Sequence, residues 1–66
     1  MNINTTTFGE WLSQEMTNAD LTASQVARLS GLTPSSIRGL MKGHQFPTLF
    51  TMQALAVVFG KQIVIM

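Results

Sequence analysis

Apolar residues recur at the spacing of an α-helix in four stretches of the chain, and short polar segments separate these stretches. The pattern predicts helices over residues of about 8–18, 23–30, 34–42 and 49–59. After them, residues 62–66 are rich in β-branched side chains and are predicted to form a short strand. The pattern therefore predicts a mainly α fold, in which a compact four-helix domain is followed by a C-terminal β-strand.

Hydroxyl residues and glycines mark the ends of the predicted helices. Thr7 and Glu10 fit a capping box, in which a hydroxyl and a carboxylate cap each other's backbone amides at a helix start. Thr22 and Gln25 fit a second capping box, and Thr33-Pro34 places an N-cap hydroxyl before a proline at the first helical position. Glycines are predicted to end the last three helices: Gly31 in a left-handed cap, and Gly43 and Gly60 as stops.

The fourth predicted helix carries more apolar residues than one buried face requires. The residues expected to face the core are Leu49, Met52, Leu55, Ala56 and Phe59. The surplus apolar residues are Phe50, Ala54, Val57 and Val58, and the predicted strand adds Ile63, Val64 and Ile65. We expect this surplus to form a homodimer interface, with the strands pairing across a two-fold axis. The alternative for the strand is pairing within one chain, against residues 2–4.

Length and composition limit the possible chemistry. The chain has 66 residues and a mass of 7.2 kDa, which predicts one domain over residues 1–66 with a modest core. It has no cysteine, and its lone histidine, His44, could at most complete a carboxylate-rich metal site. We expect no metal and no cofactor. Because no secretion signal is evident and the longest apolar run, Ala54–Phe59, is too short for a bilayer, we expect a cytoplasmic protein without a membrane partner.

Charged residues are sparse but divided along the chain. The acidic residues are Glu10, Glu15 and Asp20. The basic residues are Arg28, Arg38, Lys42 and Lys61. Residues 1–20 thus carry −3 and residues 21–66 carry +4, which gives the net charge of +1. The division indicates a basic working face on the second part, with chance as the alternative for so few charges.

The second and third predicted helices form a helix-turn-helix pattern, because both are short and only Gly31-Leu32-Thr33 separates them. Ala27 is small where the third helix would cross the second, and Gly31 permits the left-handed turn. The residues expected to form the shared core are Val26, Leu32, Ile37 and Leu40. The third helix would then expose a polar face.

The segment Leu21–Gly43 resembles the Cro/repressor-type (XRE-like) helix-turn-helix family. The matching positions are Leu21, Thr22, Ala27, Gly31, Leu32, Thr33, Ile37 and Gly43. The resemblance extends over about Phe8–Gly60 and implies a DNA-binding domain whose third helix is the recognition helix. Small phage and mobile-element repressors of this type include antitoxin-type and anti-CRISPR-associated regulators.

The sequence departs from the family pattern in three ways. Ala23 stands where family members often have a phosphate-binding glutamine. Met16 and Met41 align with a buried arginine–glutamate pair, and an apolar pair of similar volume is an acceptable replacement. Gly39 stands where family members often have a long base-contacting side chain. The glycine either removes one specific contact or permits a closer approach of the backbone to DNA.

The candidate DNA-binding residues follow from this alignment. Arg38 is expected to contact a base, with guanine as the favoured target, and Lys42 is expected to contact a phosphate. His44 and Gln45 lie in the following loop and are expected to donate hydrogen bonds to phosphates. The remaining candidates are Thr22, Ser24, Gln25, Thr33, Ser35, Ser36 and Gly39. Arg28 serves either solubility or a phosphate.

The sequence favours a homodimeric transcriptional repressor that binds an inverted repeat in double-stranded DNA and regulates its own promoter. One alternative is an antitoxin that binds a protein partner. Another is an interaction module without a DNA role, which a net charge of only +1 favours. Because no nucleophile, acid–base pair or metal site is assembled, an enzyme is not expected.

Overall fold

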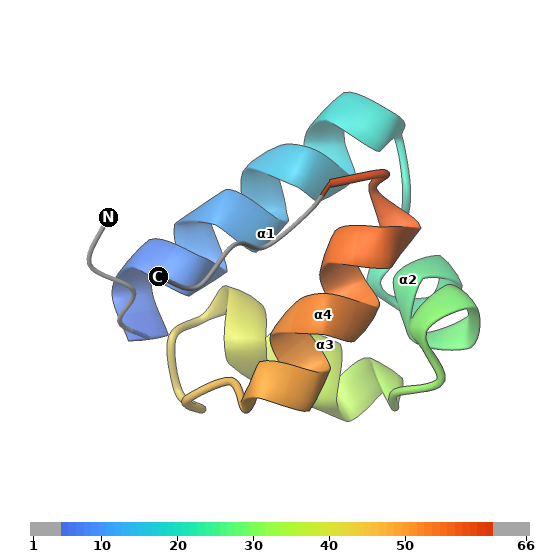
Figure 1. Ribbon diagram of the computed structural model, residues 1–66. Coiled ribbons are helices and arrows are strands. Elements are labelled where there is room, and N and C mark those ends of the chain that lie inside the picture. The colour runs from blue at the N-terminus through green and yellow to red at the C-terminus, as the bar shows by residue number, and fades with distance from the viewer. Residues whose placement is uncertain (1–4, 62–66) are drawn as a thin grey trace.

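The computed structural model describes residues 5–61. Within this range the chain forms four α-helices: α1 (Thr5–Ala19), α2 (Ala23–Ser30), α3 (Pro34–Met41) and α4 (Leu49–Val58). Helix α3 packs against both α1 and α2, and α4 packs against α2 (Figure 1). The mainly α, four-helix prediction is confirmed. The strand predicted for residues 62–66 lies outside the described residues.

Threonine hydroxyls begin three of the helices. At α2, the Gln25 amide N–H donates to Thr22 Oγ1 at 3.2 Å, and the Thr22 amide N–H donates to Gln25 Oε1 at 2.8 Å. This is the predicted capping box. Thr33 accepts from the Ser36 amide at the start of α3, and Thr48 caps α4 in the same way.

The predicted start of the first helix is wrong. Helix α1 begins at Thr5, so Thr7 lies inside the helix and not at its start. Neither glycine nor proline occurs between residues 5 and 8, so local sequence does not oppose the additional residues. The other boundaries differ by at most one residue, since α3 ends at Met41 and α4 at Val58.

Left-handed residues end the helices. Gly31 has φ 78° after α2, as predicted. After α1 the corresponding residue is Asp20, with φ 57°. There the Leu21 amide donates to the Met16 carbonyl at 2.9 Å, and the Asp20 amide donates to the Thr17 carbonyl at 3.2 Å. These two bonds form a Schellman motif, so Asp20 occupies a position that favours glycine.

The core lies where α1, α2 and α3 meet, with one face of α4 added. Its buried side chains are Phe8, Leu12, Met16, Val26, Ala27, Ile37, Leu40 and Leu55. The predicted shared core of the helix-turn-helix is confirmed, with Leu32 half-buried at its edge. Leu49 was expected inside but is 46% exposed. The buried residues of α4 lie in its second half, so a side chain at its first position extends past the core.

Gly9 brings the backbones of α1 and α3 unusually close together. A Cβ atom at this buried glycine would lie 2.6 Å from the carbonyl oxygen of Leu40 and 2.8 Å from that of Met41. Neither oxygen belongs to a flexible side chain that could move aside. The position of α3 against α1 therefore requires glycine at residue 9, which the sequence pattern did not indicate.

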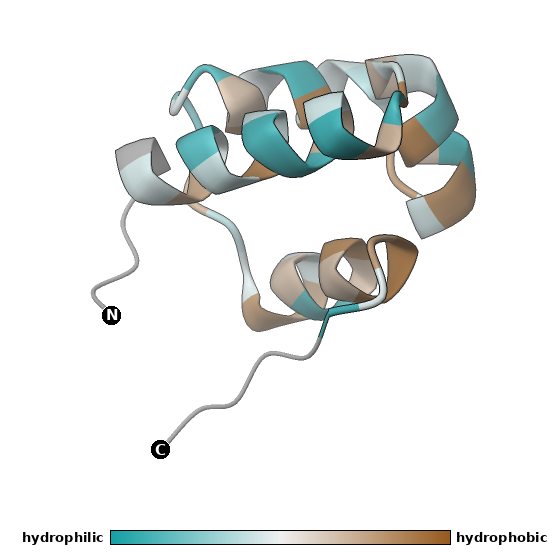
Figure 2. Cartoon of the chain, turned by 90° about the horizontal axis from the view of Figure 1, so that it is seen from above, coloured by the Kyte–Doolittle hydropathy of each residue, from teal (hydrophilic) through white to brown (hydrophobic). Residues whose placement is uncertain are grey.

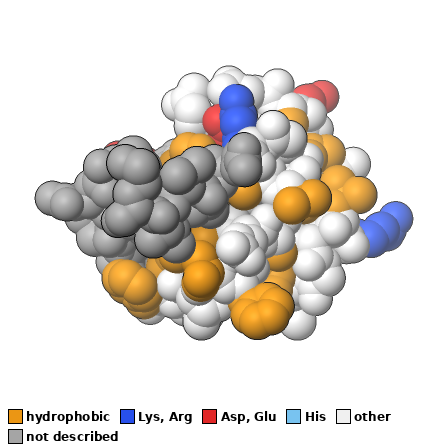
Figure 3. All heavy atoms as spheres, in the orientation of Figure 1, with side chains coloured by type: hydrophobic (Ala, Val, Ile, Leu, Met, Phe, Trp, Pro, Cys, Tyr) orange, Lys and Arg blue, Asp and Glu red, His pale blue; other side chains and the backbone are white. Residues whose placement is uncertain are grey.

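Helix α4 differs from the other helices in its hydropathy. In Figure 2 its residues are coloured mostly as hydrophobic, whereas α1 shows a hydrophilic outer face. Phe50 is 87% exposed and Val57 is 77% exposed, and both belong to the predicted apolar surplus. Figure 3 shows hydrophobic side chains on the face that carries α4, with charged side chains only toward the edges of this view.

Candidate nucleic-acid interface

The outward face of α3 is polar. Ile37 and Leu40 are buried, and with 3.6 residues per turn the opposite face carries Ser35, Gly39 and Lys42. Ser35 and Lys42 are exposed, and Gly39 is half-exposed. Arg38, also exposed, lies beside this line of residues. Four sequence-predicted residues of the third helix therefore lie together on one accessible surface, whereas Ser36 is half-buried and bonded to Thr33.

Hydrogen bonds divide the hydroxyl candidates into two groups. The Thr33 hydroxyl donates to Ser36 Oγ at 2.9 Å while it accepts from the Ser36 amide at 3.1 Å. The Thr22 hydroxyl accepts from the Gln25 amide in the capping box of α2 but, unlike that of Thr33, donates to no residue of the 5–61 range. Within residues 5–61, the exposed hydroxyls of Ser24 and Ser35 make no hydrogen bond, so they are the freest hydroxyls for an external acceptor.

The basic side chains of this region are not neutralised by neighbours. Arg28, Arg38 and Lys42 are exposed, and none of them forms an ion pair with another residue of the 5–61 range. The acidic residues all precede Leu21 in the sequence, on α1 or directly after it. The positive charge of α2 and α3 is therefore available to an anionic partner.

The loop between α3 and α4 is fixed against the end of α3. The His44 amide donates to the Gly39 carbonyl at 2.9 Å, and Pro47 is buried. Between them, the side chain of Gln45 lies across Gly39: a Cβ atom on Gly39 would lie 2.8 Å from Gln45 Nε2. The space left by the glycine is thus filled by Gln45. The sequence signalled an unusual glycine but not the residue that covers it.

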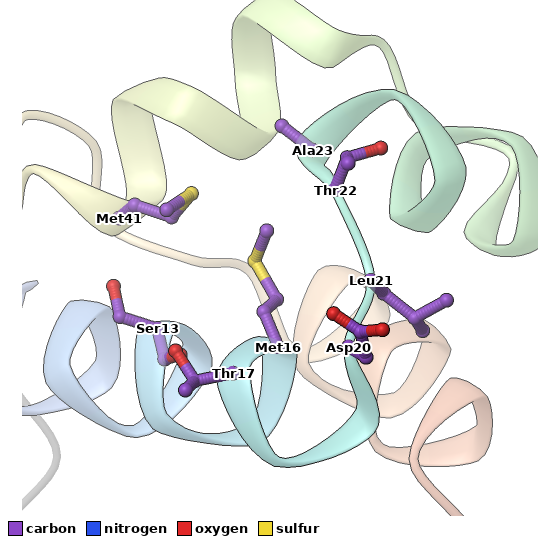
Figure 4. A pocket seen from close by; sticks show the side chains of 8 residues that line it. All are labelled: Ser13, Met16, Thr17, Asp20, Leu21, Thr22, Ala23 and Met41. Carbon is purple, nitrogen blue, oxygen red and sulfur yellow. The ribbon is translucent and has the colours of Figure 1, made fainter.

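The two methionines that stand in place of the family's ion pair line the same pocket. Met16 on α1 is buried and Met41 on α3 is half-buried, and the two side chains point toward one another (Figure 4). They line an open pocket of about 460 Å³ between α1, α2 and α3. Its remaining lining residues are Ser13, Thr17, Asp20, Leu21, Thr22 and Ala23. Met41 packs against the core cluster to which Met16 belongs, so apolar side chains occupy this part of the boundary between α1 and α3.

Among residues 5–61, no group of three or more histidine, aspartate or glutamate side chains is close enough to hold a metal ion. In the same range, no helix is both long and apolar enough to cross a membrane. His44 is exposed in the loop after α3.

Two short helices joined through a left-handed glycine, with the second helix exposing a polar face, define a helix-turn-helix domain. The chain belongs to the helix-turn-helix family, whose model matches residues 12–65. The resemblance to the Cro/repressor (XRE-like) type is thereby confirmed. No curated protein sequence matches the chain.

Solved structures extend this comparison. The restriction-modification controller protein C.AhdI from Aeromonas hydrophila is 28% identical, with a TM-score of 0.84 and 88% of each chain covered. Hydroxypropylphosphonic acid epoxidase from S. wedmorenis is 24% identical, with a TM-score of 0.80. That match covers 92% of this chain but 32% of the epoxidase, and it shows the fold alone. Family and controller protein together identify a DNA-binding transcriptional regulator, not an enzyme.

Proposed function

We propose that this protein is a transcriptional repressor that binds an inverted-repeat operator as a homodimer and controls its own promoter. The observation that carries the proposal is the outward face of α3, which is polar, basic and without ion-pair partners among the described residues. A helix with such a face can enter the major groove and hydrogen-bond to base edges. Similarity to a restriction-modification controller protein supports a regulatory role.

Each candidate residue has a proposed role at the DNA. Arg38 contacts a guanine, and Lys42 contacts a phosphate. Ser35, at the start of α3, donates its free hydroxyl to the DNA, and Ser24 does so from α2. Thr22, Gln25, Thr33 and Ser36 form the caps of α2 and α3, and the partial positive charge of these two helix starts favours phosphate binding. His44 binds the backbone from the loop.

The homodimer rests on the exposed face of α4. Phe50, Ala54 and Val57 are spaced by four and three residues, so they lie on one face of the helix, with Val58 beside them. This face points away from Leu55 and Ala56, which are buried in the core. Two copies that pack α4 against α4 bury both apolar faces about a two-fold axis. From the sequence, the proposed interface also includes the apolar residues of the predicted C-terminal strand, Ile63, Val64 and Ile65.

Selection of bound duplexes from a random DNA pool tests the proposal. A dimeric repressor selects a sequence with two inverted half-sites whose centres are about 34 Å apart or a multiple of that distance. An interaction module selects no sequence. A single, unrepeated half-site would contradict the dimer while retaining DNA binding.

The salt dependence of the same binding is a second test. With four basic side chains per chain, phosphate binding relies mainly on hydroxyl and amide groups. The slope of log K against log salt should therefore be shallow for a dimer. A slope that corresponds to about ten neutralised phosphates would contradict this mode of binding.

A second candidate is an antitoxin-type regulator that also binds a protein. Leu29 on α2 is 62% exposed and Phe46 in the loop after α3 is 67% exposed, and neither belongs to the proposed α4 interface. These two side chains are accessible to a protein partner, and a partner that joins them into one covered patch would be favoured. A stable complex with the product of a neighbouring gene, which Leu29→Asp weakens, distinguishes this candidate from a repressor that acts alone.

A further inference from the structure

Position 39 lies near the centre of the exposed face of α3. Its helical neighbours four positions before and three positions after are Ser35 and Lys42, and the buried residues Ile37 and Leu40 lie on the opposite side. A side chain at this position would point toward whatever the recognition face binds. The residue is glycine, so α3 itself supplies no side chain there.

The loop after α3 supplies one instead. A Cβ atom at Gly39 would lie 2.8 Å from Nε2, 3.0 Å from Cδ and 3.3 Å from Cγ of Gln45. The end of the Gln45 side chain therefore occupies the place of a residue-39 side chain. The loop is held there by the bond from the His44 amide to the Gly39 carbonyl and by the buried Pro47 on the other side of Gln45.

The carboxamide of Gln45 is free to bind something else. Gln45 is exposed, and its side chain makes no hydrogen bond with any other residue between 5 and 61. By contrast, the Gln25 carboxamide is partly used, because its Oε1 accepts from the Thr22 amide. A planar group with two N–H donors and one acceptor oxygen matches N7 and the N6 amino group of adenine in the major groove.

We propose that Gln45 is a specificity-determining residue that contacts adenine from the place of a residue-39 side chain. The inference rests on the proposed function, because it requires the α3 face to enter the major groove. It changes the role expected for Gln45 from the sequence, which was a phosphate contact. Base contacts specify sequence, whereas phosphate contacts position the protein without regard to sequence.

Gln45→Ala tests the proposal when the variant and the original protein are each used to select duplexes from the random pool. The variant should lose its preference for adenine at one base pair of each half-site, by roughly tenfold to a hundredfold. Preferences at other base pairs should stay unchanged. Gln14→Ala is the matched control, because Gln14 is an exposed glutamine on α1, and it should leave every preference intact.

Gly39→Ala is an independent variant that retains Gln45 but displaces it. The added methyl group meets only the far end of a flexible side chain, and alanine favours a helix more than glycine does, so the fold is retained. It should weaken the preference at the same base pair as Gln45→Ala, and the double variant should add little to either. Unfolding measured by circular dichroism confirms that the variants remain folded.

Two results would overturn the assignment. One is a Gln45→Ala protein whose affinity falls by the same factor for every sequence, which would mark a phosphate contact. The other is a Gly39→Ala protein that loses preference at a different base pair from Gln45→Ala. If the unsubstituted protein selects no sequence, the proposed function fails and this inference fails with it.

Discussion

Helices α3 and α4 begin with the same kind of N-cap but expose different surfaces. A threonine N-cap starts each of them, and each buries one face in the core. Helix α3 turns a polar, basic face outward, whereas α4 turns outward Phe50 and Val57, which are 87% and 77% exposed. One chain therefore presents two different surfaces, one suited to an anionic ligand and one suited to an apolar partner.

The two helices also differ in how the fold holds them. Helix α3 packs against both α1 and α2, and its backbone approaches α1 at Gly9. Helix α4 packs on α2, and Phe59 directly after it meets Trp11 edge to face, with ring centroids 5.9 Å apart. Packing within one chain thus fixes the recognition face, whereas the α4 face is left open by the described residues and would be covered by a second copy under the proposed function.

The largest expected effect concerns the α4 surface. Phe50→Asp places a charge on the proposed two-fold interface in both copies, so dimerisation should weaken by about 4 kcal/mol, two hot-spot losses of about 2 kcal/mol each. The isolated chain should remain folded, because Phe50 is already exposed. Sedimentation equilibrium measures the first effect and circular dichroism the second.

Leu29→Asp is the matched control for this change, since Leu29 is also a large exposed apolar residue but lies on α2. It should leave the oligomeric state unchanged. If Leu29→Asp dissociates the protein and Phe50→Asp does not, the interface lies on α2 and not on α4.

Gly9→Ala tests whether the close approach to α1 fixes the position of α3. The new methyl group meets the backbone oxygens of Leu40 and Met41, which cannot rotate away. The free energy of unfolding should fall by about 3 kcal/mol, near the upper end of the cost of overpacking. Chemical denaturation of the monomer measures it.

The matched control for Gly9→Ala is Gly39→Ala, the same substitution at another helical glycine. There the methyl group meets only the flexible end of Gln45, and the helix gains up to about 1 kcal/mol from alanine. The two substitutions should thus change stability in opposite directions. Equal effects would show that α3 is not held by a close approach to α1.

Arg38→Ala sharpens the assignment of the α3 face. Loss of a guanine contact should reduce operator affinity by about 1–3 kcal/mol and relax specificity at one base pair of each half-site. Because Arg38 is exposed and forms no ion pair within residues 5–61, stability should not change. Arg28→Ala should instead lower affinity by a similar factor for all sequences, or not at all. Unchanged operator affinity in a folded Arg38→Ala protein would contradict the assignment.

Local signals in the sequence were sufficient for most of the fold. Thr22 with Gln25, Thr33 with Pro34, and Gly31 each act within a few residues, so the limits of α2 and the start of α3 were predicted correctly. Capping is a local interaction, which is why these predictions were confirmed. The start of α1 was predicted too late, because Thr7 resembles an N-cap but the helix begins two residues earlier, at Thr5.

Contacts between distant parts of the chain were not visible in the pattern. The role of Gly9 depends on the Leu40 carbonyl, more than thirty positions later, and a lone glycine in a helix carries no signal of that approach. Gly39 was recognised as unusual, but the loop residue that covers it depends on the path of the chain after α3. The candidate DNA-binding residues were found from family resemblance, and their roles remain predictions.

The weakest effect is expected at Asp20, which belongs to neither of the two surfaces. Asp20 has φ 57°, a conformation that costs a residue with a side chain more than it costs glycine, and its negative charge lies at the C-terminal end of α1, where the helix dipole disfavours it. Asp20→Gly should raise the free energy of unfolding by about 0.5–1 kcal/mol. Asp20→Asn retains a side chain and removes only the charge, so it should give a smaller gain, about 0.3 kcal/mol.

Thermal unfolding of the three proteins measures the difference, and neither variant should change DNA selection or the oligomeric state. A less stable Asp20→Gly protein would show that the left-handed turn after α1 is held by the aspartate side chain and not by the two backbone bonds from Asp20 and Leu21.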